Sequence, residues 1–260
     1  MPDLAVLATS LASGSLVGFS LGLVGGGGSI LAVPLLVFLV GVASPHVAIG
    51  TAAVAVAANA LIGLIQHARA GNVRWPCAAL FSTLGVAGAW LGAKLGQAVD
   101  GRLLLGLFAV LMVVVAALML ARRRATGAEG VPHLSMSNAP RLAGAGLSVG
   151  ALSGFFGIGG GFLIVPGLVF SAGFPMAYAV GTSLVAVSAF GITTAATYAF
   201  SGLVDWGIAA LFIAGGAAGS FLGLWAVKRL SVKRGALETV FAALILTVAS
   251  YTLWRSATGL

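Results

Sequence analysis

Two clusters of glycine interrupt apolar stretches of this sequence, "GLVGGGGSILAVP" over residues 22–34 and "GFFGIGGGFLIVP" over residues 154–166. Consecutive glycines are unfavourable in a helix, so each cluster predicts a break in the helical backbone. Each break directly precedes an apolar segment, whose first backbone N–H groups are free and lie at the positive end of the helix dipole. Such groups bind anions without a buried charged side chain. The clusters therefore predict either an anion-binding site or a pair of simple kinks.

Most of the polar side chains within apolar sequence belong to two further segments, "AIGTAAVAVAANALIGLIQHARAG" and "AVGTSLVAVSAFGITTAATYAFSG". Hydroxyl and amide groups are neutral hydrogen-bond donors that could complete the coordination of an oxyanion. The alternative is that they form hydrogen bonds between helices. With the glycine clusters, they make up the predicted substrate-binding set: Gly25, Gly26, Gly27, Gly28, Ser29, Thr51, Asn59, Gly157, Gly159, Gly160, Gly161, Thr182 and Ser183.

Residues for other chemistry are missing from the apolar segments. All five carboxylates are predicted to lie in loops, near a terminus or at the start of a helix, which argues against a carboxylate proton relay. We find no catalytic Ser/His/Asp set, no histidine pair with metal-ligand spacing and no nucleotide-binding glycine motif. We therefore expect no enzyme activity, no cofactor and no metal. His67, near the end of its segment beside Arg69, is predicted to be a surface residue.

The composition identifies the environment of the chain. Of its 260 residues, 60% are hydrophobic and only 7% are charged, whereas soluble domains carry about 25% charged residues. The net charge of +8 is dispersed among short loops, which argues against a nucleic-acid partner. We predict an all-α polytopic membrane protein in contact with lipid. Its apolar segments are expected near 4–24, 29–43, 46–66, 76–95, 102–121, 142–157, 161–173, 176–199, 206–226 and 236–254.

The chain contains an internal repeat. Gly18–Pro34 aligns with Gly150–Pro166 at an offset of 132, and Gly50-Thr51 aligns with Gly181-Thr182 at an offset of 131. We predict a first transmembrane repeat over 1–121, a linker over 122–141 and a second repeat over 142–260, which together form one membrane domain. Glycines also recur every four residues before each cluster, a pattern typical of close helix packing in lipid. These are Gly14, Gly18, Gly22 and Gly26 in the first repeat, and Gly146, Gly150 and Gly154 in the second.

The distribution of Lys and Arg predicts the orientation of the repeats. With five segments in each repeat, the second is inverted, and ten Lys and Arg residues fall on one side against three on the other. Parallel repeats would divide them 7 to 6. Because cytoplasmic loops are enriched in Lys and Arg, we predict inverted repeats, a cytoplasmic linker and two periplasmic termini. The segments after the glycine clusters are short enough to be half-helices. Whether the first two segments of each repeat cross fully or form a re-entrant hairpin at the glycine cluster is left open, since both give the same sides.

The motifs resemble those of the sulfite exporter TauE/SafE family. The residues that carry the resemblance are "GLVGGGGSILAVPLLV" and "GFFGIGGGFLIVPGLV", followed by "AIGTA", "AVGTSL", "GNVRW" and "GLVDW", and it extends over nearly the whole chain. It implies export of small sulfur oxyanions or organosulfonates across the bacterial inner membrane. One departure is that Ala52 stands where the second repeat has Ser183, so that a symmetric pair of hydroxyls lacks one member.

We therefore predict a secondary transporter that exports a small anion, such as sulfite or sulfoacetate, by alternating access. The membrane potential alone would drive an anion outward by about 2.3 kcal/mol per charge per 100 mV. A passive anion channel and a non-transporting membrane subunit or receptor are the alternatives. The sequence leaves open the identity of the anion, the coupling ion and the oligomeric state, a homo-oligomer being one alternative.

Overall fold

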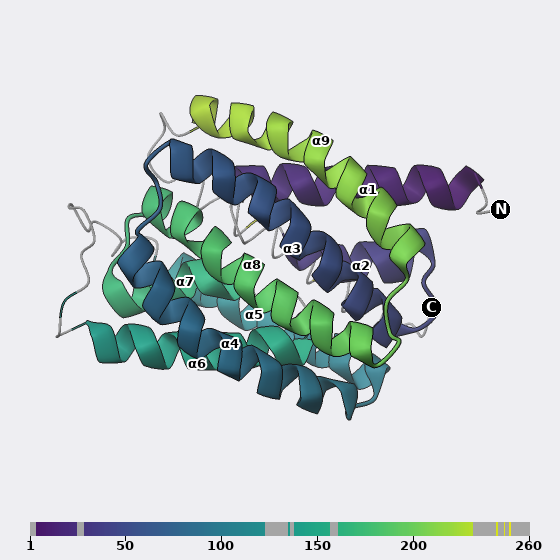
Figure 1. Cartoon of the computed structure of the whole chain (residues 1–260), viewed down its shortest axis with the longest axis horizontal. Helices are drawn as coiled ribbons and strands as arrows, with labels where there is room; N and C mark the ends of the chain where they lie inside the picture. The colour runs from purple at the N-terminus through teal and green to yellow at the C-terminus, as the bar shows by residue number, and fades with distance from the viewer. Residues whose placement is uncertain are drawn as a thin grey trace.

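The computed structural model describes residues 4–24, 29–122, 135, 138–156 and 161–230, together with the single positions 243, 247 and 250. Every regular element in these ranges is helical (Figure 1). The elements are α1 (Leu4–Val24), α2 (Ala32–Leu35), η2 (Leu36–Val40), α3 (Pro45–Arg69), α4 (Trp75–Gln97), α5 (Gly101–Arg122), α6 (Ala139–Phe156), α7 (Gly161–Ala172), α8 (Met176–Phe200) and α9 (Trp206–Leu230).

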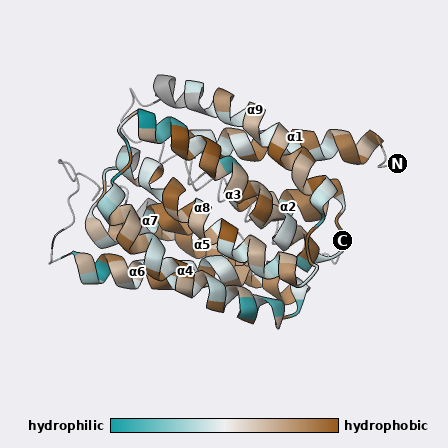
Figure 2. Ribbon diagram, viewed as in Figure 1, coloured by the Kyte–Doolittle hydropathy of each residue, from teal (hydrophilic) through white to brown (hydrophobic). Residues whose placement is uncertain are grey.

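The helices coincide closely with the apolar segments expected from the sequence. Among the described residues, five helices are long and apolar enough to cross a membrane: Leu4–Leu23, Pro45–Arg69, Trp75–Gln97, Tyr178–Phe200 and Trp206–Gly223. Hydrophilic residues lie mostly near helix ends (Figure 2). The prediction of an all-α chain with several membrane-spanning helices is thus confirmed for this part of the molecule. The expected segment 236–254 lies almost entirely outside the described residues.

The helical stretches after the glycine clusters are short. Ser29–Val40 and α7 each contain twelve residues, which corresponds to about 18 Å of helix, against about 30 Å for the hydrocarbon core. Pro34 lies in the first and Pro166 in the second. Gly41 ends η2 in the left-handed conformation with φ 84°, and Gly173 follows α7 with φ 65°. Positive φ favours glycine because the residue has no Cβ, so both stretches end at matching glycines.

The glycines that recur every four residues bring two pairs of helices into backbone contact. A Cβ on Gly14 or Gly18 of α1 would clash with the backbone of Phe212 or Gly216 of α9. In the second pair, the same holds for α6 and α4: a Cβ on Gly146 would clash with Phe81, one on Gly150 with Gly85 and one on Gly154 with Ala89. In both pairs, residues later in one helix contact residues later in the other helix, so the two helices of each pair are parallel. The predicted role of these glycines in close packing is confirmed.

Helices α3 and α8 lie side by side between these two pairs (Figure 1). They are antiparallel, because Gly50 near the start of α3 touches Leu203 just beyond the end of α8. At the other end, Gly181 near the start of α8 touches Asn72 just beyond the end of α3. The long helices therefore form a central antiparallel pair flanked by two parallel pairs, and each parallel pair contains one helix from each half of the chain.

Candidate functional site

Two hydrogen bonds join the halves of the chain at opposite ends of the α3–α8 pair. The backbone N–H of Asp205 donates to Oγ1 of Thr51 at 2.9 Å. The backbone N–H of Arg74 donates to Oγ1 of Thr182 at 3.1 Å. Thr51 and Thr182 are 131 positions apart, as are Arg74 and Asp205. We call these contacts the Thr51 clasp and the Thr182 clasp.

The glycine before each threonine makes its clasp possible. A Cβ on Gly50 would clash with the carbonyl oxygen of Leu203, and one on Gly181 would clash with that of Asn72. In each clasp, a loop backbone from one half of the chain therefore packs directly on the helix backbone of the other half. The loop N–H, which would be costly to bury without a partner, is satisfied by the threonine hydroxyl. In each Gly-Thr motif, the glycine thus lets the loop backbone approach the helix, and the threonine binds the N–H group of that loop.

The structure does not bring the two predicted threonines to one point. Thr51 lies 18 residues before the end of α3, and Thr182 lies beyond that end, beside Arg74. At 1.5 Å per helical residue the threonines are roughly 25 Å apart. One small anion therefore cannot contact both hydroxyls. Their partners are the α8–α9 and α3–α4 loops, whereas the alternative that the sequence offered was hydrogen bonding between helices.

Asn59 is the member of the predicted set whose polar atoms have no partner. Its side chain is 0% exposed, and neither Oδ1 nor Nδ2 makes a hydrogen bond. The amide packs on Gly216 of α9, where a Cβ would overlap it. Gly216 in turn contacts Gly18 of α1. The unpaired amide therefore lies at the point where α1 and α9 are in closest contact.

The equivalent position in the other half of the chain is apolar. Asn59 corresponds to Phe190 at the offset of 131, and Gly216 corresponds to Gly85. Phe190 packs on Gly85 and stacks on Phe81 with 6.1 Å between ring centroids. The two halves thus share a backbone arrangement but not a side chain at this contact. Only the α1–α3–α9 side presents a polar group there.

The remaining predicted residues are placed as follows. Ser29 is buried at the start of the first short stretch, and Gly161 is the first residue of α7. Ser183 donates a hydrogen bond to the carbonyl oxygen of Val180 in its own helix, at 2.7 Å. The other predicted glycines lie outside the described residues: Gly25, Gly26, Gly27, Gly28, Gly157, Gly159 and Gly160.

The prediction that His67 is a surface residue is wrong. Its side chain is buried, and neither ring nitrogen has a hydrogen-bond partner. Its equivalent in the second half, at the offset of 131, is Tyr198, whose hydroxyl is likewise buried and unpaired. Aligning the repeats position by position would have revealed this pair, because Tyr198 lies in an apolar context that suggests burial. Other buried hydroxyls without a partner are those of Ser10, Ser13, Ser82, Ser153 and Thr194.

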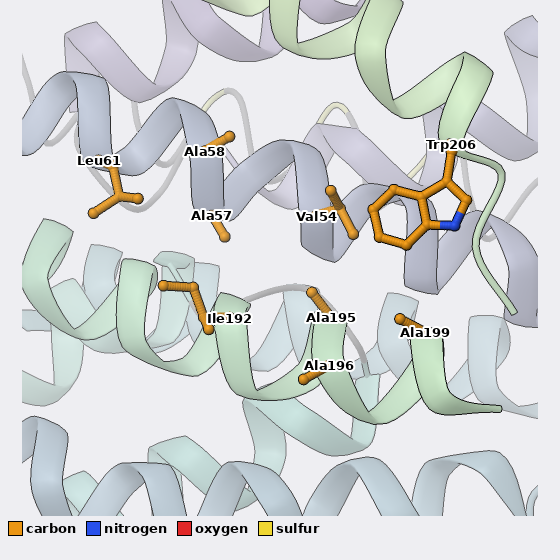
Figure 3. A pocket seen from close by; sticks show the side chains of 9 residues that line it. All are labelled: Val54, Ala57, Ala58, Leu61, Ile192, Ala195, Ala196, Ala199 and Trp206. Carbon is orange, nitrogen blue, oxygen red and sulfur yellow. The ribbon is translucent and has the colours of Figure 1, made fainter. Parts of the chain in front are cut away.

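A groove with a volume of about 340 Å³ runs between α3 and α8 (Figure 3). It is lined by four residues of α3 from Val54 to Leu61, four of α8 from Ile192 to Ala199, and Trp206 of α9. Leu61, Ile192 and Trp206 are exposed. Apart from the indole N–H of Trp206 the lining side chains are apolar, so the groove offers too few donors for an anion. It is suited to contact with lipid chains.

Comparison with known proteins identifies the family to which this architecture belongs. The model of the sulfite exporter TauE/SafE family matches residues 10–252. The chain belongs to this family. This TauE/SafE protein is 49% identical over 251 residues to a "Probable membrane transporter protein" of Xylella fastidiosa (strain 9a5c), with 96% of each chain covered.

A more distant relative shows the same relationship. The "Probable membrane transporter protein YdhB" of Bacillus subtilis (strain 168) is 28% identical over 209 residues, which cover 80% of this chain and 85% of the relative. No solved structure matches the chain. Because the family model and both relatives are described as transporters, the TauE/SafE protein is a membrane transporter. Among its described residues, no group of His, Cys, Asp and Glu side chains is arranged to hold a metal ion.

Proposed function

We propose that this transporter exports a small anion, a sulfur oxyanion or an organosulfonate, by alternating access of two inverted repeats in the bacterial inner membrane. The pair of threonine clasps carries the proposal. They are equivalent by position in the repeats, they lie at opposite ends of α3 and α8, and each joins the two halves of the chain.

The helix directions support the inversion. Helices α1, α3 and α4 of the first half correspond to α6, α8 and α9 of the second. Helices α3 and α8 are antiparallel, α1 is parallel to α9, and α4 is parallel to α6. Each helix of the first half therefore runs opposite to the corresponding helix of the second half. Inverted repeats allow two states that exchange the conformations of the halves. We infer that one clasp opens in each state and that both are closed here, as in an occluded state.

The basic residues support the orientation. Arg69, Arg74 and Arg141 all lie toward one end of the helices, since α4 and α6 are parallel and α3 ends where α4 begins. Cytoplasmic loops are enriched in such residues. We place this end, with the Thr182 clasp and the linker 122–141, in the cytoplasm. The Thr51 clasp and both termini then lie on the periplasmic side, and α1 with Ser29–Val40, like α6 with α7, forms a hairpin that returns the chain to the side from which it entered.

Asn59 supports the choice of an anion. A buried amide without a partner costs about 1–3 kcal/mol, and it is unusual unless something binds to it. Its NH₂ group offers two donors and no charge, which suits an oxyanion that must also be released. We propose that Asn59 contacts the substrate together with the backbone of both glycine clusters. Thr51 and Thr182 then control access from the two ends.

The transport activity can be tested directly in proteoliposomes. We expect purified protein to move sulfite, thiosulfate or sulfoacetate under an imposed membrane potential, with saturation and counterflow, and in preference to sulfate and chloride. Saturation and counterflow separate a transporter from a channel, which would show neither. If no anion of this panel crosses, the proposed function is wrong.

Cys77, the single cysteine of the chain, reports on the Thr182 clasp. It is buried in the first turn of α4, three residues after Arg74. Thr182→Val removes the acceptor for the Arg74 N–H, so we expect labelling of Cys77 by a thiol reagent to accelerate by about fivefold or more, as for a lost hydrogen bond worth ~1 kcal/mol. The matched control, Thr51→Val, opens the other end and should not accelerate labelling. Equal acceleration in both variants would contradict separate gates.

A further inference from the structure

We propose that Arg74 and Tyr178 form a capture site for the anionic substrate at the end of the transport pathway that holds the Thr182 clasp. We call this end the Arg74 mouth, and the end that holds the Thr51 clasp the opposite mouth. We further propose that Asp205 gives the opposite mouth the reverse charge. This inference rests on the proposed function, because it assigns a recognition site to the same anion. It also predicts a property that the proposed function does not require, namely different apparent affinities on the two faces.

The geometry of Arg74 points to a ligand outside the protein. The Cζ atom of its guanidinium lies 4.3 Å from the centroid of the Tyr178 ring, at the start of α8. Its backbone is held by the hydrogen bond to Thr182. Stacking on the ring orients the planar guanidinium through its face and does not use its N–H donors. The Nε atom is buried and has no hydrogen-bond partner.

No carboxylate of the described residues neutralises Arg74. The described carboxylates are those of Asp100 and Asp205. Asp100 follows α4, whose 23 residues separate it from Arg74 by about 35 Å. Asp205 belongs to the Thr51 clasp at the other end of α3. The neighbouring charged residues at the Arg74 mouth, Arg69 and Arg141, are basic and exposed.

The opposite mouth has the same backbone and different side chains. At the offset of 131, Asp205 replaces Arg74 and Val47 replaces Tyr178. The carboxylate of Asp205 accepts a hydrogen bond from the N–H of Ile208 at 3.0 Å and so caps α9. The two mouths therefore differ by two charge units at equivalent positions. One presents a stacked cation, and the other presents an anion.

This asymmetry has a kinetic consequence. A guanidinium binds an oxyanion through two parallel N–H donors, and a charged cleft raises the local concentration of its ligand. Substrate should therefore load at a lower concentration from the Arg74 mouth, whereas Asp205 should promote its departure from the other. The final distribution of substrate does not change, because the membrane potential sets it.

The test measures the half-saturation concentration separately on each face, in right-side-out and inside-out vesicles, with sulfite and sulfoacetate as probes. Arg74→Gln keeps the backbone N–H that binds Thr182. We expect it to raise the half-saturation concentration on its own face by about tenfold, the lower end of the effect of electrostatic focusing, with little change on the other face. The increase should shrink at high ionic strength. Arg74→Lys should retain part of the effect.

Two further variants serve as controls. Arg69→Gln removes an exposed charge from the same end of the molecule without touching the stacked guanidinium, and it should raise the half-saturation concentration on that face much less than Arg74→Gln does. Asp205→Asn removes the opposite charge while preserving the cap on α9, since asparagine is also a good capping residue. It should lower the half-saturation concentration on the face of the Thr51 clasp.

The outcomes separate the two hypotheses. If the wild-type protein moves neither these probes nor thiosulfate, the proposed function is wrong. If it moves either probe and Arg74→Gln matches the wild type on both faces, the capture site is wrong and the proposed function stands. An equal loss on both faces would likewise overturn the capture site, because it would indicate that Arg74 only supports the fold.

Discussion

Replacing Gly150 by leucine is expected to prevent the two halves of the chain from packing together. A Cβ at this position of α6 would overlap the carbonyl group and Cα of Gly85 in α4. No side chain can rotate away, because the obstructing atoms are backbone atoms of a membrane-spanning helix. Overpacking of side chains costs about 1–3 kcal/mol, and a backbone clash should cost at least as much. The net stability of a folded protein is only about 5–15 kcal/mol.

The same helix provides the matched control. Gly144 also belongs to α6, but apart from its own helix backbone no described atom lies within 4 Å of the position that its Cβ would occupy. Gly144→Leu should therefore leave the thermal stability of the protein in detergent close to that of the wild type, whereas Gly150→Leu should lower the melting temperature strongly or abolish monodisperse protein. If both variants melt alike, the backbone contact of α4 and α6 is not a determinant of stability.

The second prediction separates stability from transport. Leucine has the same branching as asparagine, so Asn59→Leu should fit against Gly216 while removing the unpaired amide. We expect stability to be unchanged or to rise by about 1 kcal/mol, because an unsatisfied buried group is removed. Transport should fall about tenfold or more, since a hydrogen bond to a charged ligand contributes about 1.5–3 kcal/mol. Flux assays and thermal melting measure the two effects.

Two variants of α3 refine this prediction. Asn59→Asp keeps the shape of the side chain but replaces the NH₂ donors, so it should also abolish flux of an anion. Gln66→Leu removes a half-buried amide from the same helix and should leave flux intact. If Asn59→Leu transports normally, or if it loses flux only because the protein unfolds, Asn59 does not contact the substrate.

The helices were predictable because the signals that specify them are local. A hydrophobic run of sufficient length predicts a membrane helix without knowledge of its neighbours, and α3, α4, α8 and α9 begin and end within a few residues of the expected positions. The four-residue spacing of Gly14 and Gly18, and of Gly146 and Gly150, likewise predicted a helix interface. The sequence could not indicate that the partner of α1 is α9 or that the partner of α6 is α4.

The candidate site was harder to predict, because the role of a polar side chain in a membrane depends on its partner. Thr51, Thr182 and Asn59 looked alike as donors within apolar sequence. In the structure, both threonines accept loop N–H groups from the opposite half, while Asn59 has no partner. His67 was assigned to the surface by its neighbours in sequence, yet helix packing buries it.

The sequence by itself therefore determined the membrane environment, the helical class, the internal repeat and the glycine faces, since each follows from composition or from periodicity along the chain. Only the tertiary structure decided which helices pair, that the Gly-Thr motifs clasp loops of the opposite half, and that Arg74 stacks on Tyr178. These features depend on contacts between residues more than 100 positions apart. Such contacts arise when the two halves pack together, and the pattern within either half does not specify them.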